Sequence, residues 1–268
     1  DGQTLPVSQD EVNFNDHAIE IRLCAEDPTK EFLPCSGRLD IWSIKETQGV
    51  RVDSGVTAGS PVSPFYDPML AKVIGYGSTR TAALNNLIDA LENASIFGVR
   101  NNRNFLLHLL KQKKFRDGSA TTTFLEETYP NGFRDQIPSN TEYALVASLI
   151  YKKKLDQHFL EATNVLKELI GWSNQGRTRT AFTIQHLDEV RKIHVTCQGQ
   201  NNFLVNVDDE SIEVLISDNE IRTNGNLFSL VSFHTSQNIY QIVTDETDFC
   251  FEEINYLDKI QQSEITGA

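Results

Sequence analysis

The C-terminal part of the chain is a succession of short strand-like runs, and this feature most limits what the chain can fold into. After Gly171, seven runs alternate apolar with polar residues, as half-buried strands do. The runs cover residues 181–185, 191–197, 203–207, 212–216, 228–233, 239–244 and 249–252. Turn-forming residues such as Thr223-Asn224-Gly225 separate them at hairpin spacing. The series predicts an antiparallel barrel or sandwich.

A long helical segment precedes these runs. Ser139 and Glu142 match a capping box, in which the two side chains satisfy backbone N–H groups at a helix start. Apolar residues recur at helical spacing from Tyr143 to Leu169, with a polar break at Lys152–Lys154. We expect one long helix, or two in tandem, ending at Gly171. Its apolar residues cover much of its circumference, so burial requires surrounding structure, and we predict a barrel around the helix.

The first half of the chain mixes strand and helix patterns. Residues 17–24, 50–56 and 69–76 predict a small sheet, and residues 84–91 and 105–110 predict two helices that cover one of its faces. Helix- and strand-breaking residues concentrate in 129–138. We therefore predict an α+β chain: a small mixed α/β domain at 1–128, a linker at 129–138, and the helix with its antiparallel β-barrel at 139–268.

Charge and cysteine usage exclude several classes of function. Asp and Glu total 37 against 24 Lys and Arg, a net charge of −13, which does not favour nucleic acid or anionic lipid as partners. The apolar runs are too short to span a membrane, and the first residues have no signal-peptide pattern. The four cysteines lie in separate segments with no Cys-x-x-Cys pair, which predicts buried free thiols and no metal site.

Several ordered motifs in the first half resemble one known family. The motifs are Asp16 to Pro28, Phe32-Leu33-Pro34, Gly37, Gly49 to Val56 and Val62 to Lys72. Together they closely resemble the C-terminal domain of biotin carboxylase, over about residues 1 to 127. Asp16 stands where that family usually has glycine.

The second half is similar to that family's larger members in the order of its elements. In the α subunits of propionyl-CoA and 3-methylcrotonyl-CoA carboxylases, a long helix and an antiparallel barrel follow biotin carboxylase and bind the carboxyltransferase subunit. Tyr129 to Phe133 resembles the propionyl-type connection, whereas Arg177-Thr178-Arg179 before a compact barrel resembles the methylcrotonyl type. The acyl-CoA therefore stays open between the two, and in this family a different subunit selects it.

The resemblance implies an ATP-dependent ligase that carboxylates biotin with bicarbonate and MgATP. The family binds MgATP mainly on an upstream ATP-grasp domain, and it carries biotin on a downstream domain with a Met-Lys-Met acceptor. No glycine-rich phosphate loop precedes a helix here, and Met69 is the single methionine. We therefore expect the middle of a larger subunit, silent by itself, in a bacterial cytoplasm or a mitochondrial matrix. Its expected partners are the carboxyltransferase β subunit, other α subunits and the biotin carrier domain of the same chain.

The resemblance assigns the site residues of the first half. Arg51 occupies the position at which the family stabilises negative charge developing on biotin, a task suited to a guanidinium that stays protonated. Asp53 lies two residues on, on the same strand face, and is expected to orient Arg51 or balance its charge in the bicarbonate and biotin pocket. Tyr76 and Arg80 fall in a segment that forms subunit contacts in stand-alone biotin carboxylases.

Two features of the second half have competing interpretations. Lys152, Lys153 and Lys154 form either a solvated helix face or a surface for the carboxyltransferase partner. Trp172 belongs either to the barrel core, which we favour, or to that interface. For the chain as a whole, the alternatives are a non-catalytic assembly platform in a carboxylase complex and a small-ligand-binding barrel. Intact Arg51 opposes the first alternative, and a helix inside the barrel opposes the second.

Overall fold

The computed structural model describes residues 2–161, 177–199, 201–217, 220–244 and 246–255. Contacts divide the chain into two compact units, Asp1–Asp135 and Gln136–Ala268. We call them the N-terminal unit and the C-terminal unit. The division falls inside the segment in which breaking residues concentrate.

In its described residues, the N-terminal unit combines strands with four α-helices and two 3-10 helices, labelled η. Its elements are η1 (Gln9–Glu11), β1 (His17–Cys24), β2 (Glu26–Asp27), η2 (Pro28–Lys30), β3 (Leu33–Pro34), β4 (Gly37–Arg38), β5 (Ile41–Ser43), β6 (Val50–Ser54), β7 (Pro61–Val62), β8 (Met69–Gly77), α1 (Arg80–Glu92), β9 (Ser95–Phe97), α2 (Arg103–Leu110), α3 (Lys113–Arg116) and α4 (Phe124–Thr128). The three predicted strands and two predicted helices of this half are confirmed as β1, β6, β8, α1 and α2.

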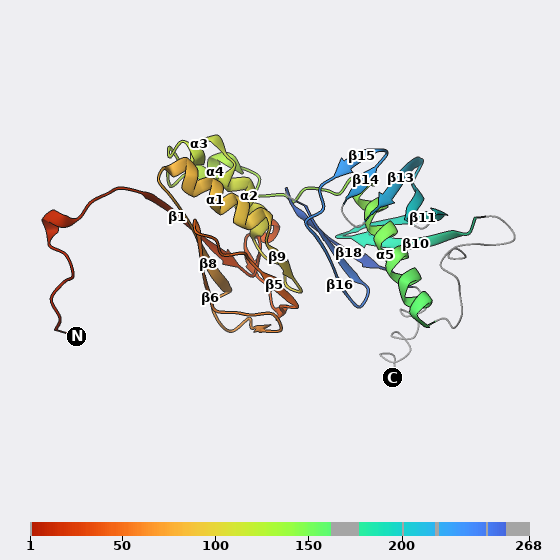
Figure 1. Ribbon diagram of the computed structural model, residues 1–268, viewed down its shortest axis with the longest axis horizontal. Coiled ribbons are helices and arrows are strands. Elements are labelled where there is room, and N and C mark those ends of the chain that lie inside the picture. The colour runs from red at the N-terminus through yellow and green to blue at the C-terminus, as the bar shows by residue number, and fades with distance from the viewer. Residues whose placement is uncertain (1, 162–176, 200, 218–219, 245, 256–268) are drawn as a thin grey trace. The chain divides into compact units, whose positions relative to one another are not determined.

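The main sheet of this unit has the antiparallel order β1-β8-β6. Alternate residues such as Ile19, Ile21 and Val73 share one buried core with residues of α1. Figure 1 shows α1 lying across this sheet. Gly75 allows α1 to lie close to the sheet, because a Cβ atom there would lie 2.4 Å from the carbonyl oxygen of Ala83. The residues that alternate with these buried ones along the three strands are mostly polar, and they lie on the other face of the sheet.

Much of the predicted linker packs onto the N-terminal unit. The rings of Tyr129 and Phe133 lie 5.7 and 5.2 Å from the ring of Phe105 on α2. The Tyr129 hydroxyl is 2.9 Å from Nδ1 of His108, and burial raises the pKa of Tyr129 to about 12. Arg100 forms an ion pair with Asp135. Residues 129–135 are therefore held by packing and charge rather than left as a free tether.

The C-terminal unit contains one described helix and one large sheet. Its elements are α5 (Asn140–Glu161), β10 (Arg179–His186), β11 (Glu189–Gly199), β12 (Asn202–Val207), β13 (Glu210–Ile216), β14 (Ile221–Thr223), β15 (Asn226–Phe228), β16 (Ser232–Ser236), β17 (Ile239–Val243) and β18 (Asp248–Glu253). The prediction of one strand over 228–233 is wrong, since β15 ends at Phe228 and β16 begins at Ser232. The sequence pattern also missed β14, which has only three residues.

The nine strands form one antiparallel sheet that must curl strongly. Their order is β15-β14-β13-β12-β11-β10-β18-β17-β16, so the two edge strands are consecutive along the chain. Flat, the sheet would place its edges roughly 38 Å apart at ~4.8 Å per strand pair. Phe228 and Ser232 can be at most about 14 Å apart, at ~3.6 Å per residue. The short connection therefore requires the sheet to curl into a half-barrel, and the chain turns between β15 and β16, inside the run predicted as one strand over 228–233.

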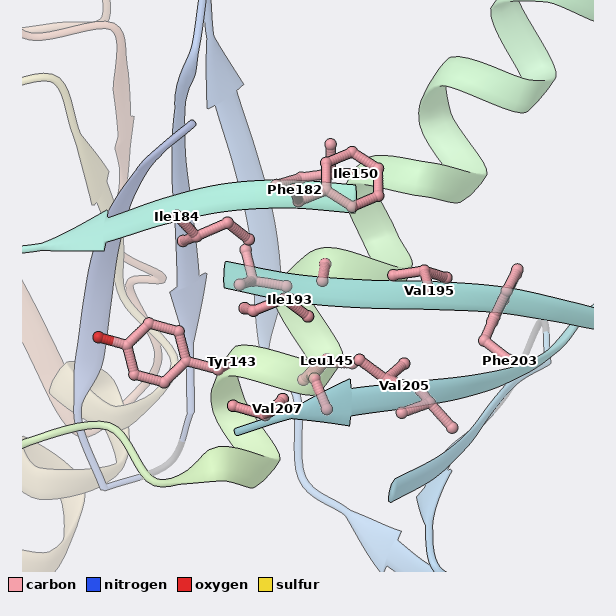
Figure 2. Close-up of a cluster of buried hydrophobic side chains, with 14 of the residues drawn as sticks. Tyr143, Leu145, Ile150, Phe182, Ile184, Ile193, Val195, Phe203, Val205 and Val207 are labelled. Atoms are coloured by element: carbon pink, nitrogen blue, oxygen red, sulfur yellow. The ribbon is translucent and has the colours of Figure 1, made fainter. Parts of the chain in front are cut away.

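Helix α5 lies inside the curl of this sheet. Its start has the predicted cap: the Ser139 N–H donates to Oε2 of Glu142 at 2.7 Å, and the Ser139 hydroxyl accepts from the Thr141 N–H at 3.2 Å. Tyr143 to Ala147 are consecutive and fully buried, which at ~3.6 residues per turn means that every side of the helix is covered. Figure 2 shows Tyr143, Leu145 and Ile150 among strand residues such as Ile193 and Val205. The helix thus fills the concave side of the sheet, where a small-ligand-binding barrel would need space.

The cysteines do not share one environment. All four are free; Cys24 and Cys197 are buried, Cys35 is half-buried and Cys250 is exposed on β18. Burial raises the pKa of the Cys24 thiol to about 11. The prediction of buried thiols is therefore correct for Cys24 and Cys197 and wrong for Cys250, whose side chain points outward in the strand alternation.

Arg191 on β11 connects α5 to the sheet, and replacing it is expected to destabilise that contact. Its guanidinium lies 4.5 Å over the ring of Tyr143, donates to Asn140, and pairs with Asp208 at 3.2 Å and Glu189 at 2.6 Å. We expect Arg191→Gln to lower the opening free energy of the α5 amides by about 1–2 kcal/mol. Amide hydrogen exchange over residues 140–150 measures this opening free energy.

The matched control for that experiment is Arg222→Gln. Arg222 makes a similar two-bond pair with Glu220, but its side chain is 42% exposed, and within the described residues no hydrogen bond or ion pair joins it to a helix. An equal loss of protection in the two variants would contradict the assigned role of Arg191.

Candidate active-site arginine

Arg51 and Asp53 lie together on the edge strand β6 of the N-terminal unit. In this strand Val50 is buried and Val52 is half-buried, whereas Arg51 and Asp53 are exposed on the opposite face. The register of β6 with β8 places Arg51 opposite Ile74 and Asp53 opposite Lys72. The strand alternation therefore puts both charged side chains on the outer face of the sheet, as the sequence predicts.

The two side chains form a bidentate ion pair. Nε of Arg51 donates to Oδ1 of Asp53 at 2.8 Å, and Nη2 donates to Oδ2 at 2.8 Å. The hydrogen bonds from Arg51, with help from the charge of Lys72, hold the pKa of Asp53 below its usual value. The pair fixes the plane of the guanidinium. Among the described residues, both N–H groups of Nη1 and one of Nη2 have no hydrogen-bond acceptor. These remaining donors suit an oxygen atom that carries negative charge.

Glu46 supports the pair in a way that the sequence analysis missed. Its Oε1 accepts a hydrogen bond from the Val52 N–H at 2.9 Å, between the two members of the pair. Its charge also adds to that of Asp53 in raising the pKa of Arg51. Glu46 lies in the connection before β6 with no motif around it, so only its position in space reveals this contact.

Tyr76 and Arg80 both have partners within the N-terminal unit. The Tyr76 hydroxyl donates to Oδ2 of Asp16 at 2.5 Å, and this bond raises the pKa of Tyr76. Nη2 of Arg80 donates to the carbonyl oxygen of Phe115 at 2.7 Å, and its guanidinium lies 5.4 Å over the Phe115 ring. Tyr76 is exposed and Arg80 is half-buried. Their assignment to a subunit contact stays a prediction.

The three lysines of α5 point to three different parts of the curled sheet. Lys152 donates to Asn201 at 3.0 Å, Lys153 donates to Thr235, and Lys154 pairs with Glu253 at 2.6 Å. Lys154 also lies 5.2 Å over the ring of Phe182. All three lysines therefore contact surrounding strands while they stay partly exposed, and the choice between a solvated face and a docking surface stays a prediction. Trp172 lies outside the described residues.

Neither a metal cluster nor a membrane helix is found in the part of the chain that the structure describes. No three His, Cys, Asp or Glu side chains there are placed to hold a metal ion. No helix there is long and apolar enough to cross a membrane.

Comparison with known proteins identifies relatives of both units. Residues 20–127 match the family model of the biotin carboxylase C-terminal domain. The human mitochondrial propionyl-CoA carboxylase α chain is 35% identical over 223 residues, which are 80% of this chain and 29% of that protein. The α subunit of the mitochondrial methylcrotonoyl-CoA carboxylase of Arabidopsis thaliana is 41% identical over 143 residues, 54% of this chain and 20% of that protein.

Bacterial proteins and solved structures are also similar. Biotin carboxylase 2 of Bacillus subtilis is 42% identical over 126 residues, 47% of this chain and 28% of that protein. The crystal structure of the biotin carboxylase subunit of pyruvate carboxylase aligns with a TM-score of 0.48 and 36% identity, over 51% of this chain and 30% of that one. The chain spans only 19% to 30% of the length of the curated relatives it matches.

These matches include the strand that carries Arg51 and Asp53 and, for the human relative, extend over most of the chain. Residues 20–127 are therefore a biotin carboxylase C-terminal domain, and the chain is homologous to part of the α subunits of propionyl-CoA and methylcrotonoyl-CoA carboxylases.

Proposed function

We propose that this chain is the part of an acyl-CoA carboxylase α subunit in which Arg51 serves biotin carboxylation and the C-terminal unit binds the carboxyltransferase β subunit. The observation that carries the proposal is the Arg51–Asp53 pair. It holds a charged guanidinium in one plane on an exposed sheet face, with donors left over for a ligand. The acyl-CoA is propionyl-CoA or 3-methylcrotonyl-CoA.

The chemistry of Arg51 follows from its charge and its fixed orientation. Biotin, when bound, supplies the ureido group that receives the carboxylate. Asp53 raises the pKa of Arg51, so the guanidinium stays protonated throughout. Its free N–H groups can donate to a substrate oxygen that gains negative charge, and no reorganisation is needed because Asp53 already fixes the plane. We assign the binding of MgATP and bicarbonate mainly to the ATP-grasp domain that precedes such a domain in this family.

The C-terminal unit is proposed to be the docking domain, with a barrel-type sheet around a central helix. Three observations support this assignment: the burial of α5 on all sides, the short connection between the edge strands, and the place of the unit directly after a biotin carboxylase C-terminal domain. Lys152, Lys153 and Lys154 are partly exposed and are candidates for the docking surface. Tyr76 and Arg80 are candidates for contact with other α subunits, and the biotin carrier domain is a third expected partner.

The test is the isolation of the native polypeptide that contains these residues. Antibody capture, mass measurement and a streptavidin probe give its size and its biotin content. We expect a biotinylated polypeptide much larger than 30.2 kDa that transfers labelled bicarbonate to biotin when MgATP is present. An unbiotinylated product that fixes no label would contradict the proposal and favour the non-catalytic assembly platform.

A further inference from the structure

Strand β6 is an edge strand, and the segment before it folds back along its outer edge. The order β1-β8-β6 leaves one side of β6 without a paired strand among the described residues. Thr47 forms an isolated antiparallel bridge with Val50, in which the Val50 N–H donates to the carbonyl oxygen of Thr47 at 3.1 Å. In the same turn, the carbonyl oxygen of Gly49 accepts a hydrogen bond from the Tyr76 N–H of β8 at 2.8 Å. The turn is therefore held at the sheet, and it brings Glu46 alongside β6.

Glu46 accepts the next N–H group along this edge. Its Oε1 lies 2.9 Å from the backbone nitrogen of Val52. That N–H belongs to the peptide plane that joins Arg51 to Val52, so the hydrogen bond restrains the orientation of this plane. Arg51 and Asp53 can meet only while the backbone between them stays extended, because side chains two residues apart then share one strand face. Glu46 thus acts on the backbone from which both members of the pair project.

The contact is not required to satisfy the strand or to build the core. Glu46 is exposed, and water can accept the N–H of an edge strand when no side chain does. An exposed acid at a sheet edge can serve solely to prevent pairing with another chain. That role would need the charge of Glu46 but not its hydrogen bond to Val52, so the two roles can be separated by experiment.

We propose that Glu46 is a positioning residue for Arg51, because it fixes the peptide plane after Arg51 so that the guanidinium and Asp53 meet in one orientation. This inference deepens the proposed function, on which it rests. Arg51 can stabilise developing charge without reorganisation only if its guanidinium plane is set beforehand. Glu46 acts through the Arg51–Asp53 pair, so its effect should appear in turnover and not in the KM for ATP.

The test is transfer of labelled bicarbonate to biotin by the full-length polypeptide. Glu46→Ala removes the acceptor and should lower kcat about fivefold, the scale of one exposed hydrogen bond, with the KM for ATP unchanged. Glu46→Gln removes the charge but keeps an oxygen that accepts the Val52 N–H, so its kcat should stay within about twofold of the native value. The matched control is Glu11→Ala, since Glu11 is also exposed and accepts the Ser8 N–H at 2.7 Å, and its kcat should be unchanged.

Two further measurements distinguish positioning from a general structural role. In an Asp53→Asn background, Glu46→Ala should lower kcat by less than about twofold, because the pair through which Glu46 acts is already loosened. Exchange of the Arg51 Nε–H with solvent, followed by NMR at low temperature, needs no catalysis. This N–H donates to Asp53, and it should exchange faster in Glu46→Ala than in the native chain.

The outcomes separate this inference from the proposed function. An equal fall in kcat for Glu46→Gln and Glu46→Ala overturns the inference, because the charge and not the hydrogen bond would then matter. Unchanged exchange of the Arg51 Nε–H in Glu46→Ala overturns it too, even if the native polypeptide carboxylates biotin. A native polypeptide that fixes no label contradicts the proposed function, whereas faster Nε–H exchange in Glu46→Ala supports the positioning of Arg51 in either case.

Discussion

Replacing Arg51 with glutamine is expected to lower the turnover rate of biotin carboxylation by about 10²- to 10³-fold, the range found when one preorganised donor to a developing oxyanion is removed. The measurement is transfer of labelled bicarbonate to biotin by the full-length polypeptide. The loss should fall on kcat rather than on the KM for ATP, because Arg51 is proposed to act on charge that develops during the reaction.

The physical reason lies in the geometry of the Arg51–Asp53 pair. The two parallel hydrogen bonds to Asp53 fix the guanidinium plane and leave the Nη1 donors free. Arg51→Lys keeps the charge but loses the fork, so its activity should lie between those of the native protein and Arg51→Gln. Asp53→Asn should lower the turnover rate less than Arg51→Lys or Arg51→Gln does, because it loosens the orientation of Arg51 without removing its charge.

Arg38→Gln provides the matched control for this prediction. Arg38 is also an exposed arginine with an aspartate two residues on, and it lies 3.5 Å from Asp40 at a side-chain exposure of 74%. Its replacement should leave carboxylation unchanged. A rate for Arg51→Gln within threefold of the Arg38→Gln rate would remove Arg51 from the site.

Replacing Arg103 with methionine is expected to destabilise the N-terminal unit by about 3 kcal/mol, the scale for removing a charged donor from two carbonyl oxygens that are shielded from solvent. Arg103 begins α2 and is 2% exposed. Its Nε donates to the carbonyl oxygen of Leu91 at 2.7 Å, and Nη2 donates to that of Glu92 at 2.9 Å. Both are carbonyls of the last turn of α1, and that of Leu91 also accepts a hydrogen bond from the Ala94 N–H at 3.2 Å.

Methionine preserves most of the apolar stem of Arg103, so the expected loss comes from the buried carbonyls rather than from a cavity. The free energy of unfolding of the N-terminal unit is obtained from amide hydrogen exchange in β1 and β8. Arg38→Met is the control at an exposed arginine, and it should change the free energy of unfolding by less than about 0.5 kcal/mol. An equally small loss of unfolding free energy in Arg103→Met would contradict the prediction, because it would mean that water replaces the guanidinium without loss of stability.

Local sequence patterns were sufficient wherever one element determined the outcome. Alternation identified β1, β6 and β8, and Ser139 with Glu142 identified the start of α5. The same alternation placed Arg51 and Asp53 on one face, which the structure shows as a bidentate pair. In each case the information lies within a few residues, because backbone geometry fixes the period of two in strands and the hydrogen-bonding needs of a helix end.

Features that depend on pairing between distant segments could not be predicted in this way. Glu46 supports β6 from a connecting segment, and the register of β8 decides which cation faces Asp53. The lysines of α5 reach Asn201, Thr235 and Glu253, which are far from them in sequence. A charge cluster on a helix indicates a solvated face only when solvent surrounds that helix.

The sequence by itself determined most of the strands and helices, the two-part organisation, the family and the place of Arg51 on its strand, because each depends on local periodicity or on an ordered motif. The tertiary structure decided how far the nine-stranded sheet curls, what the lysines of α5 contact and which residues of β8 lie opposite Arg51 and Asp53. Those features depend on strand order and register, which the packing of the whole unit selects and no single segment encodes.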